Sequence, residues 1–156
     1  MAIHELSNFR RGKLNRHHLK DDDMEHNILV TTISGPIDYA TVNAVAQVRF
    51  RSFEALEESK VASIIIFQGS MKVTPDAVDL FAKVLQKQKT ESTKTLSVAY
   101  VAPLDIEDRN STCKLFQEIF FQNGIAWQVF ERLDDAQEWA RLMVRNDRAG
   151  SAQHTN

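Results

Sequence analysis

The stretch from Ala62 to Phe67 constrains the fold more than any other part of this sequence. It contains Ile64, Ile65 and Ile66 in succession, and consecutive side chains of an extended strand point to opposite faces. A strand that is apolar on both faces is typical of the centre of a mostly parallel sheet, where helices cover both sides. The run therefore predicts an alternating α/β domain.

Strands and helices are expected to alternate on either side of this run. β-branched stretches bounded by Gly, Pro and Asn predict the strands, and apolar residues at spacings of three and four predict the helices. The predicted strands are 28–34, 62–67, 95–101 and 125–130, and the predicted helices are about 38–57, 74–85, 107–122 and 134–145.

Residues suited to helix ends support these boundaries. Asp38 and Asp134 stand where an N-cap is expected before the first and last helices. Thr74 can cap the second helix through its hydroxyl, and Pro75 suits the first helical position because it has no N–H to leave unpaired. Gly124 supplies a left-handed stop after the third helix.

One domain over residues 28–146 accounts for the whole pattern. A chain of 156 residues fits a single domain, and no linker or repeat divides it. Residues 1–27 hold four of the five histidines and an acidic run, and they are expected to form a flexible arm or a β-hairpin. Residues 147–156 are small and polar and are expected to be a disordered tail.

The composition narrows the classes of partner and compartment. A net charge of −2 argues against nucleic acid, which is bound by a basic face. The single cysteine, Cys113, favours a reducing compartment. The N-terminus lacks the apolar run of a signal peptide, and nowhere do roughly 18 apolar residues follow one another as in a membrane span. We therefore expect a cytoplasmic location and no transmembrane segment.

No catalytic, metal or cofactor motif is evident, so the sequence predicts a protein that is not an enzyme. Gly69 stands alone, whereas a phosphate loop needs spaced glycines followed by Lys and Ser or Thr. His17 and His18 are adjacent and lack a second pair at helical spacing, so they do not predict a metal site. Cys113 falls on the apolar stripe of a predicted helix and is expected to be a core thiol.

The loop after the isoleucine strand is the candidate partner or ligand site. It consists of Gln68, Gly69, Ser70 and Met71, to which we add Thr74 at the start of the next helix. In open α/β sheets ligands gather beyond the carboxyl ends of the strands, and a helix N-terminus attracts anions. Ser70 is a candidate phosphoacceptor. In the alternative interpretation Gly69 and Ser70 only turn the chain and Thr74 only caps the helix.

Aromatic residues concentrate towards the C-terminus, and two of them are adjacent. Phe120 and Phe121 cannot both face one sheet, so one of the two is expected to be exposed. An exposed aromatic often marks a partner or lipid surface. The pair is therefore the candidate apolar surface.

Two segments resemble a known family. The loop and helix start Gly69–Ala77 and the closing segment Val129–Trp139 resemble the STAS-like (SpoIIAA-like) domains. The likeness is to the small bacterial branch related to anti-sigma factor antagonists and to Sec14 (CRAL-TRIO) lipid-binding domains, and it covers residues 27–145. It implies a mixed, mostly parallel sheet of four to six strands packed with about four helices.

The resemblance also implies a function. It predicts a non-catalytic bacterial module for regulatory protein–protein interaction, with a partner that the sequence does not identify. Binding of a small apolar ligand or lipid is the alternative, and a homodimer is expected if one sheet face stays partly uncovered. Antagonist domains carry a phosphorylated hydroxyl in an Asp-Ser-Ser/Thr-Gly motif; here Gln68-Gly69-Ser70-Met71 lacks its acid and its last glycine, and Ser70 is the matching hydroxyl.

Overall fold

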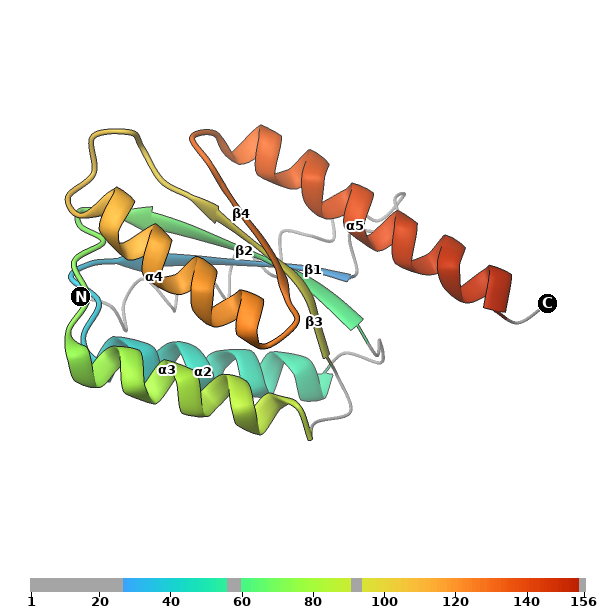
Figure 1. The fold of residues 1–156 in the computed structure, drawn as a ribbon, viewed down its shortest axis with the longest axis horizontal. Helices are drawn as coiled ribbons and strands as arrows, with labels where there is room; N and C mark the ends of the chain where they lie inside the picture. The colour runs from blue at the N-terminus through green and yellow to red at the C-terminus, as the bar shows by residue number, and fades with distance from the viewer. Residues whose placement is uncertain (1–26, 56–59, 91–93, 155–156) are drawn as a thin grey trace.

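The computed structural model describes residues 27–55, 60–90 and 94–154, and the side chains of 27–52, 60–90 and 94–150. Strands and helices alternate along the chain, which confirms the predicted α/β class (Figure 1). The predicted arm lies outside the described residues except for Asn27. The elements are β1 (Ile28–Ser34), α2 (Tyr39–Ala55), β2 (Lys60–Gln68), α3 (Pro75–Gln88), β3 (Lys94–Val101), α4 (Arg109–Gln122), β4 (Ala126–Phe130) and α5 (Leu133–His154).

The strands form one sheet in the order β1-β2-β3-β4. Ile64 pairs with Val30 on one side and with Ala99 on the other, so the isoleucine strand has neighbours on both sides, as predicted. All three described pairs are parallel, whereas a mixed sheet was expected. A helix follows every strand and returns the chain to the starting edge, so each new strand runs in the same direction.

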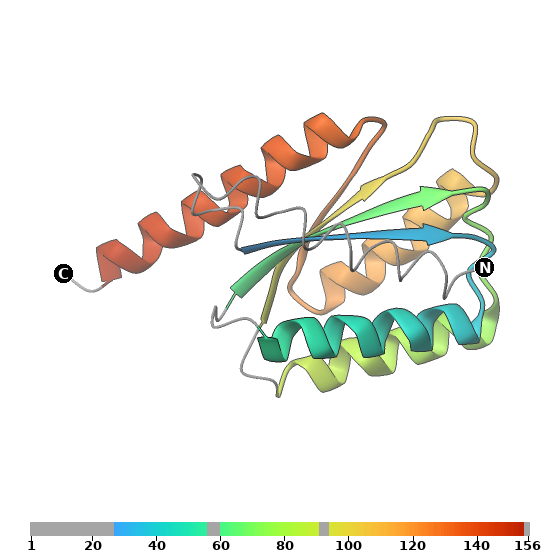
Figure 2. The same cartoon turned by 180° about the vertical axis from the view of Figure 1, so that it is seen from behind.

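The consecutive strand order distributes the helices unequally over the two faces. Crossovers of one hand that always step in one direction place their helices on one side of a sheet. Accordingly α2, α3 and α4 cover one face and α5 covers the other (Figures 1 and 2). The larger core, beneath α2–α4, includes Ile33, Ile65, Phe67, Met71, Val98, Tyr100, Cys113, Phe116 and Phe120.

Helix α5 covers the second face through small residues. Ala136 and Ala140 are fully buried against Ile64 and Ala99, and the absence of bulk on the helix lets it approach the sheet closely. Trp139 packs at the margin, with its ring 5.8 Å from that of Phe130. Both faces of the described sheet therefore carry helices, and α5 contacts β2, β3 and β4 on its side. The homodimer stays a prediction.

The last helix is longer than the sequence predicted. α5 runs through most of the segment 147–156, which was expected to be a disordered tail. Lys60 Nζ donates to Asp147 over 2.9 Å, and Arg148 donates to Asn27 Oδ1 over 2.6 Å. These contacts tie the extension to the first described residue and to the start of β2, and composition alone does not reveal them.

The start of α2 follows the prediction and the start of α3 follows it in part. Asp38 accepts hydrogen bonds from the backbone N–H and the hydroxyl of Thr41, and both bonds lower the pKa of Asp38. Thr74 is the N-cap residue of α3, and Pro75 opens the helix. The Thr74 hydroxyl makes no capping bond, however, and donates instead to the Asp76 carboxylate. The predicted capping role of this side chain was wrong.

The remaining helix ends give one confirmation and one correction. Gly124 has φ 70°, and Ile125 N–H donates to Phe120 O over 3.0 Å, so the predicted left-handed stop after α4 is confirmed. Helix α5 already begins at Leu133, which places Asp134 inside the first turn and not at the cap. There its carboxylate complements the positive end of the helix dipole.

Candidate functional site

The predicted loop after β2 is fastened between its two neighbours. Gly35 N–H donates to Gln68 O over 2.9 Å from the side of β1. From the side of β3, Met71 N–H donates to Glu107 O over 2.9 Å, and the Ser70 hydroxyl donates to Glu107 Oε1 over 2.5 Å. The loop is therefore a junction that holds three parts of the chain together.

Packing confines half of this loop to the interior. Met71 has no exposed surface, and the Thr112 hydroxyl of α4 donates to its carbonyl over 2.6 Å. Ser70 is buried, Thr74 is half-buried, and only Gln68 and Gly69 are exposed. Met71 thus belongs to the core and is not available as a partner contact, because α4 arrives from later in the chain to cover it.

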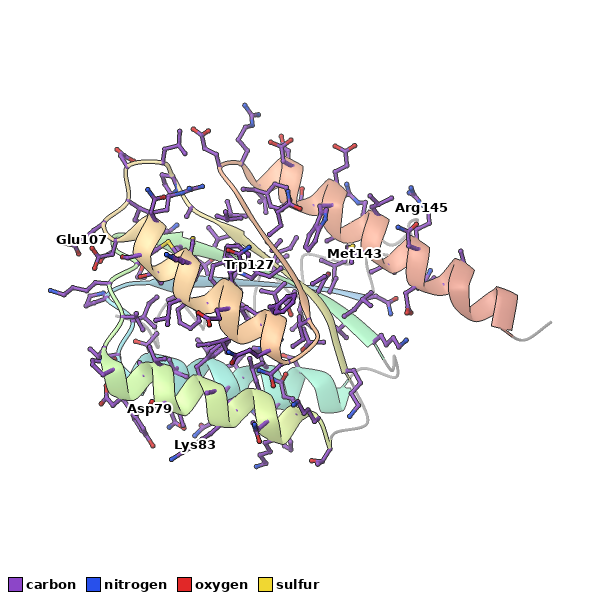
Figure 3. The ribbon with its side chains drawn as sticks, viewed as in Figure 1. Asp79, Lys83, Glu107, Trp127, Met143 and Arg145 are labelled. Atoms are coloured by element: carbon purple, nitrogen blue, oxygen red, sulfur yellow. The ribbon has the colours of Figure 1, made fainter. Side chains whose placement is uncertain are left out.

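Ser70 keeps its hydroxyl occupied. A phosphate on this side chain would break the bond to Glu107, whose side chain lies at this end of the sheet (Figure 3). The phosphate charge would then stand beside a carboxylate, an arrangement that disrupts by like-charge repulsion. The phosphoacceptor role of Ser70 stays a prediction, and this geometry gives it no support.

The strand order removes the physical reason for a ligand at this edge. Open α/β sheets bind ligands where the strand order reverses, because helices diverge there to opposite faces and open a crevice. The order β1-β2-β3-β4 never reverses, and α2, α3 and α4 stay together on one face. The space beneath these helices is therefore the more suitable place for a ligand.

A cavity of about 60 Å³ lies between the sheet and α2–α4. Its lining is mainly apolar and draws on all three helices and on β1–β3. The lining residues are Ile33, Ile37, Thr41, Val42, Val45, Ala46, Arg49, Ile65, Phe67, Phe81, Val84, Leu85, Gln88, Thr95, Val98, Tyr100, Phe116 and Phe120. None of the predicted loop residues contributes.

Three polar members of this lining gather at one place. Arg49 of α2 donates to the Thr95 hydroxyl of β3 over 3.3 Å, and that hydroxyl donates to Gln88 Oε1 of α3 over 3.2 Å. Arg49 is only 8% exposed, and burial lowers its pKa to about 10, so the guanidinium remains charged at neutral pH. Burial also raises the pKa of Tyr100, which lines the same cavity.

A groove of about 560 Å³ runs along the outer surface of α2 and α3. It adjoins the cavity, since Ala46, Val84 and Gln88 line both. Figure 3 shows Lys83 on the outer side of α3. The lining residues are Asn43, Ala46, Gln47, Phe50, Arg51, Leu80, Lys83, Val84, Lys87 and Gln88.

Sequence reasoning missed the cavity and the groove, although one signal was present. Arg49 follows Val42 and Val45 at helical spacing, so a cation interrupts the apolar stripe of α2. A charged residue at such a position is rarely buried without a partner. The cavity itself depends on how three helices pack together, and no local pattern encodes that.

The two candidate surface aromatics have opposite environments. Phe120 is 2% exposed, and its ring lies 5.2 Å from Phe81 and 6.0 Å from Tyr100. Phe121 is 80% exposed on the other side of α4. The prediction that one of the pair is exposed is confirmed, and Phe120 leaves the candidate apolar surface because it is part of the core.

Other chemistry is sparse in the described part of the chain. Cys113 is buried, as predicted, and burial raises the pKa of its thiol. No three His, Cys, Asp or Glu side chains of the described residues are placed to hold a metal ion, and His17 and His18 lie outside that part. Within the same part, no helix has the length and hydropathy needed to cross a membrane.

Comparison with known proteins gives no relative. No protein-family model, curated protein or solved structure matches this chain. The STAS-like resemblance of the sequence therefore stays a prediction, and the cavity and the groove are the features that point to a function.

Proposed function

We propose that this domain is a non-catalytic binding module whose ligand is a small molecule with an apolar body, held beneath α2 and α3. The cavity supports this proposal. Ligand sites are typically apolar hollows with a few polar groups that fix orientation, and the apolar cavity with its Arg49–Thr95–Gln88 group has that composition.

The size of the cavity shows that a ligand must reach beyond it. Ligand pockets usually measure about 300–1,000 Å³, well above the 60 Å³ enclosed here. The adjoining groove has the missing volume, and Ala46, Val84 and Gln88 line both hollows. We infer that a ligand enters through this seam between α2 and α3, with part of its body in the groove.

The energy gained by filling the cavity also indicates that the ligand must extend into the groove. An unfilled cavity destabilises a core by about 24 cal/mol per Å³, which for 60 Å³ is about 1.4 kcal/mol. Recovering that energy improves a dissociation constant only about tenfold. Most of the affinity must then come from contacts along the groove, where Phe50 and Leu80 present apolar surface.

The test uses a neutral apolar fluorophore, N-phenyl-1-naphthylamine, together with native mass spectrometry of the gently purified protein. Ala46→Phe places a ring in the seam and is expected to abolish saturable probe binding. Ala40→Phe, on the exposed part of the same helix, is the matched control and should bind like the wild type. A clean apo mass with equal binding by both variants would contradict the proposal.

A regulatory protein-interaction module is the second candidate, and we retain the STAS-like kinship as part of that proposal. Its support is the exposed tip formed by Gln68, Gly69 and Lys72 beside the exposed Glu107. Pull-down from native lysate with the wild type and with Ser70→Asp tests it. Identical captured proteins for both, or none, would count against a switch at this loop.

A further inference from the structure

Arg49 gives the apolar cavity a buried cation. Among the described residues it is the only buried one with a charged side chain, and it reaches the lining from the middle of α2. A guanidinium offers donors in a planar fork that matches the two oxygens of a carboxylate. Such a pair is strongest where water is excluded, as it is around this side chain.

We propose that the ligand is an anionic amphiphile, a carboxylate on an unbranched alkyl chain, with its headgroup at Arg49. This inference depends on the proposed ligand-binding function, because it names the chemical class that the cavity takes. The headgroup would lie beside Thr95 and Gln88, the first methylene groups would fill the cavity, and the rest of the chain would pass between Ala46 and Val84 into the groove.

The protonation state of Arg49 suits this role. Although burial lowers its pKa to about 10, the side chain stays protonated at neutral pH. A fatty carboxylate is ionised at the same pH, since carboxyl groups titrate near pH 4–5 in water, at about 4.3 for Glu. The two charges therefore coexist over a wide range of pH.

The groove outside the seam has charges of the same sign. Arg51, Lys83 and Lys87 line it, and its described lining residues include no carboxylate. Lys87 Nζ lies 6.0 Å from the centroid of the Phe50 ring, so a cation and an apolar face stand side by side. Clustered cations attract an anion before contact and raise its association rate. The groove thus forms an entrance that favours an anionic amphiphile over a neutral one.

The dimensions along α3 set the length of the chain. Leu80 and Gln88 mark the two ends of the contribution of α3 to the groove, and eight residues of helix rise by about 12 Å. An alkyl chain of medium length matches this span. We therefore choose decanoate as the probe and 1-decanol as its neutral counterpart of equal chain length.

The experiment measures displacement of N-phenyl-1-naphthylamine by the two probes. Decanoate is expected to bind the wild type at least tenfold more tightly than decanol. Arg49→Met should weaken decanoate binding at least tenfold more than decanol binding and so remove this preference, and Arg145→Met, on the exposed face of α5, should behave like the wild type. Lys83→Gln with Lys87→Gln should lower the association rate of decanoate and its sensitivity to salt.

The outcomes separate the two proposals. Equal affinity of the wild type for decanoate and decanol, with displacement by both, overturns the carboxylate inference and leaves the apolar site standing. Displacement by neither probe overturns the inference, and failure of the fluorophore itself to bind overturns the site. If Arg49→Met does not fold, Arg49→Lys and the wild-type preference decide, since the lysine variant keeps the charge and should keep more than half of the preference on a logarithmic scale.

Discussion

The hydroxyl of Ser70 donates to a carboxylate oxygen of Glu107 over 2.5 Å and so joins the loop after β2 to the loop after β3. Lys72 N–H donates to the same hydroxyl oxygen over 3.0 Å. A hydrogen bond to a charged acceptor is stronger than one between neutral groups. The two loops therefore form one structural unit at the carboxyl edge of the sheet.

The first prediction concerns the charge at this contact. Ser70→Asp is expected to lower the free energy of unfolding by about 2 kcal/mol, because a buried donor is replaced by a carboxylate facing Glu107. Glu107→Gln should destabilise the wild type but stabilise the Ser70→Asp protein, since the glutamine removes the repulsion. Urea unfolding of the wild type, the two single variants and the double variant gives the coupling free energy between the two residues. If Glu107→Gln changes stability with the same sign in the wild type and in the Ser70→Asp protein, the prediction is contradicted.

The second prediction compares the two adjacent phenylalanines of α4. Phe120→Ala should cost about 3–5 kcal/mol, the usual loss for a large aromatic removed from a packed core. Phe121→Ala should change stability by less than about 0.5 kcal/mol, because 80% of the residue is exposed. Denaturant unfolding measures the free energy of unfolding of both variants, provided that their m-values are equal. Similar losses of stability for the two variants would place Phe121 in an interface.

The third prediction concerns a close backbone approach. A Cβ added at Gly35 would lie 1.7 Å from the carbonyl oxygen of Ser70, so Gly35→Ala must displace one of the two loops. We expect a loss of about 2 kcal/mol or more, as for other overpacked sites. Gly150→Ala is the matched control: it meets nothing within 4 Å and lies in α5, so it should gain roughly 0.5–1 kcal/mol. If Gly35→Ala leaves the thermal unfolding temperature unchanged, the loops that contain Gly35 and Ser70 are free to separate.

The fourth prediction concerns alkaline pH. Burial raises the pKa of Tyr100, so above about pH 10 the unfolded chain releases a proton that the folded protein keeps. The stability contribution is therefore intact below about pH 10 and falls as the pH rises, by up to about 1.4 kcal/mol per pH unit. Tyr100→Phe should show a smaller decline between about pH 10 and 11.5.

Urea unfolding of the two proteins at matched pH values checks this difference. Arg49, whose lowered pKa acts with the opposite sign, is present in both, so the difference in slope reports the phenol together with its electrostatic effect on Arg49. Parallel stability curves would mean that Tyr100 ionises in the folded protein.

The strands and most helices could be predicted because they depend on local pattern. β1 has the predicted limits, 28–34, and the isoleucine strand lies inside the sheet between two neighbours. Periodicity also placed Cys113 and one of the two adjacent phenylalanines in the core. These features follow from which face of a helix or strand carries apolar residues.

The candidate site could not be predicted in the same way, because it depends on contacts between distant segments. Met71 follows a strand and precedes a helix, so it reads as loop, yet Thr112 and the rest of α4 cover it. The cavity needs α2, α3 and α4 together, and only the interruption by Arg49 signals it in the sequence. The length of α5 likewise depends on Lys60 and Asn27, far from it along the chain.

Because α5 follows all four strands and alone among the described helices covers its side of the sheet, that face stays open until α5 has been synthesised. A ribosome that has not yet released the residues after Leu133 holds a sheet with Ile64 and Ala99 open to water. Such a nascent chain is a natural client for chaperones that recognise exposed aliphatic surface. A stop codon anywhere before the alanines of α5 should yield an insoluble product, whereas a stop codon after Gly150 should not.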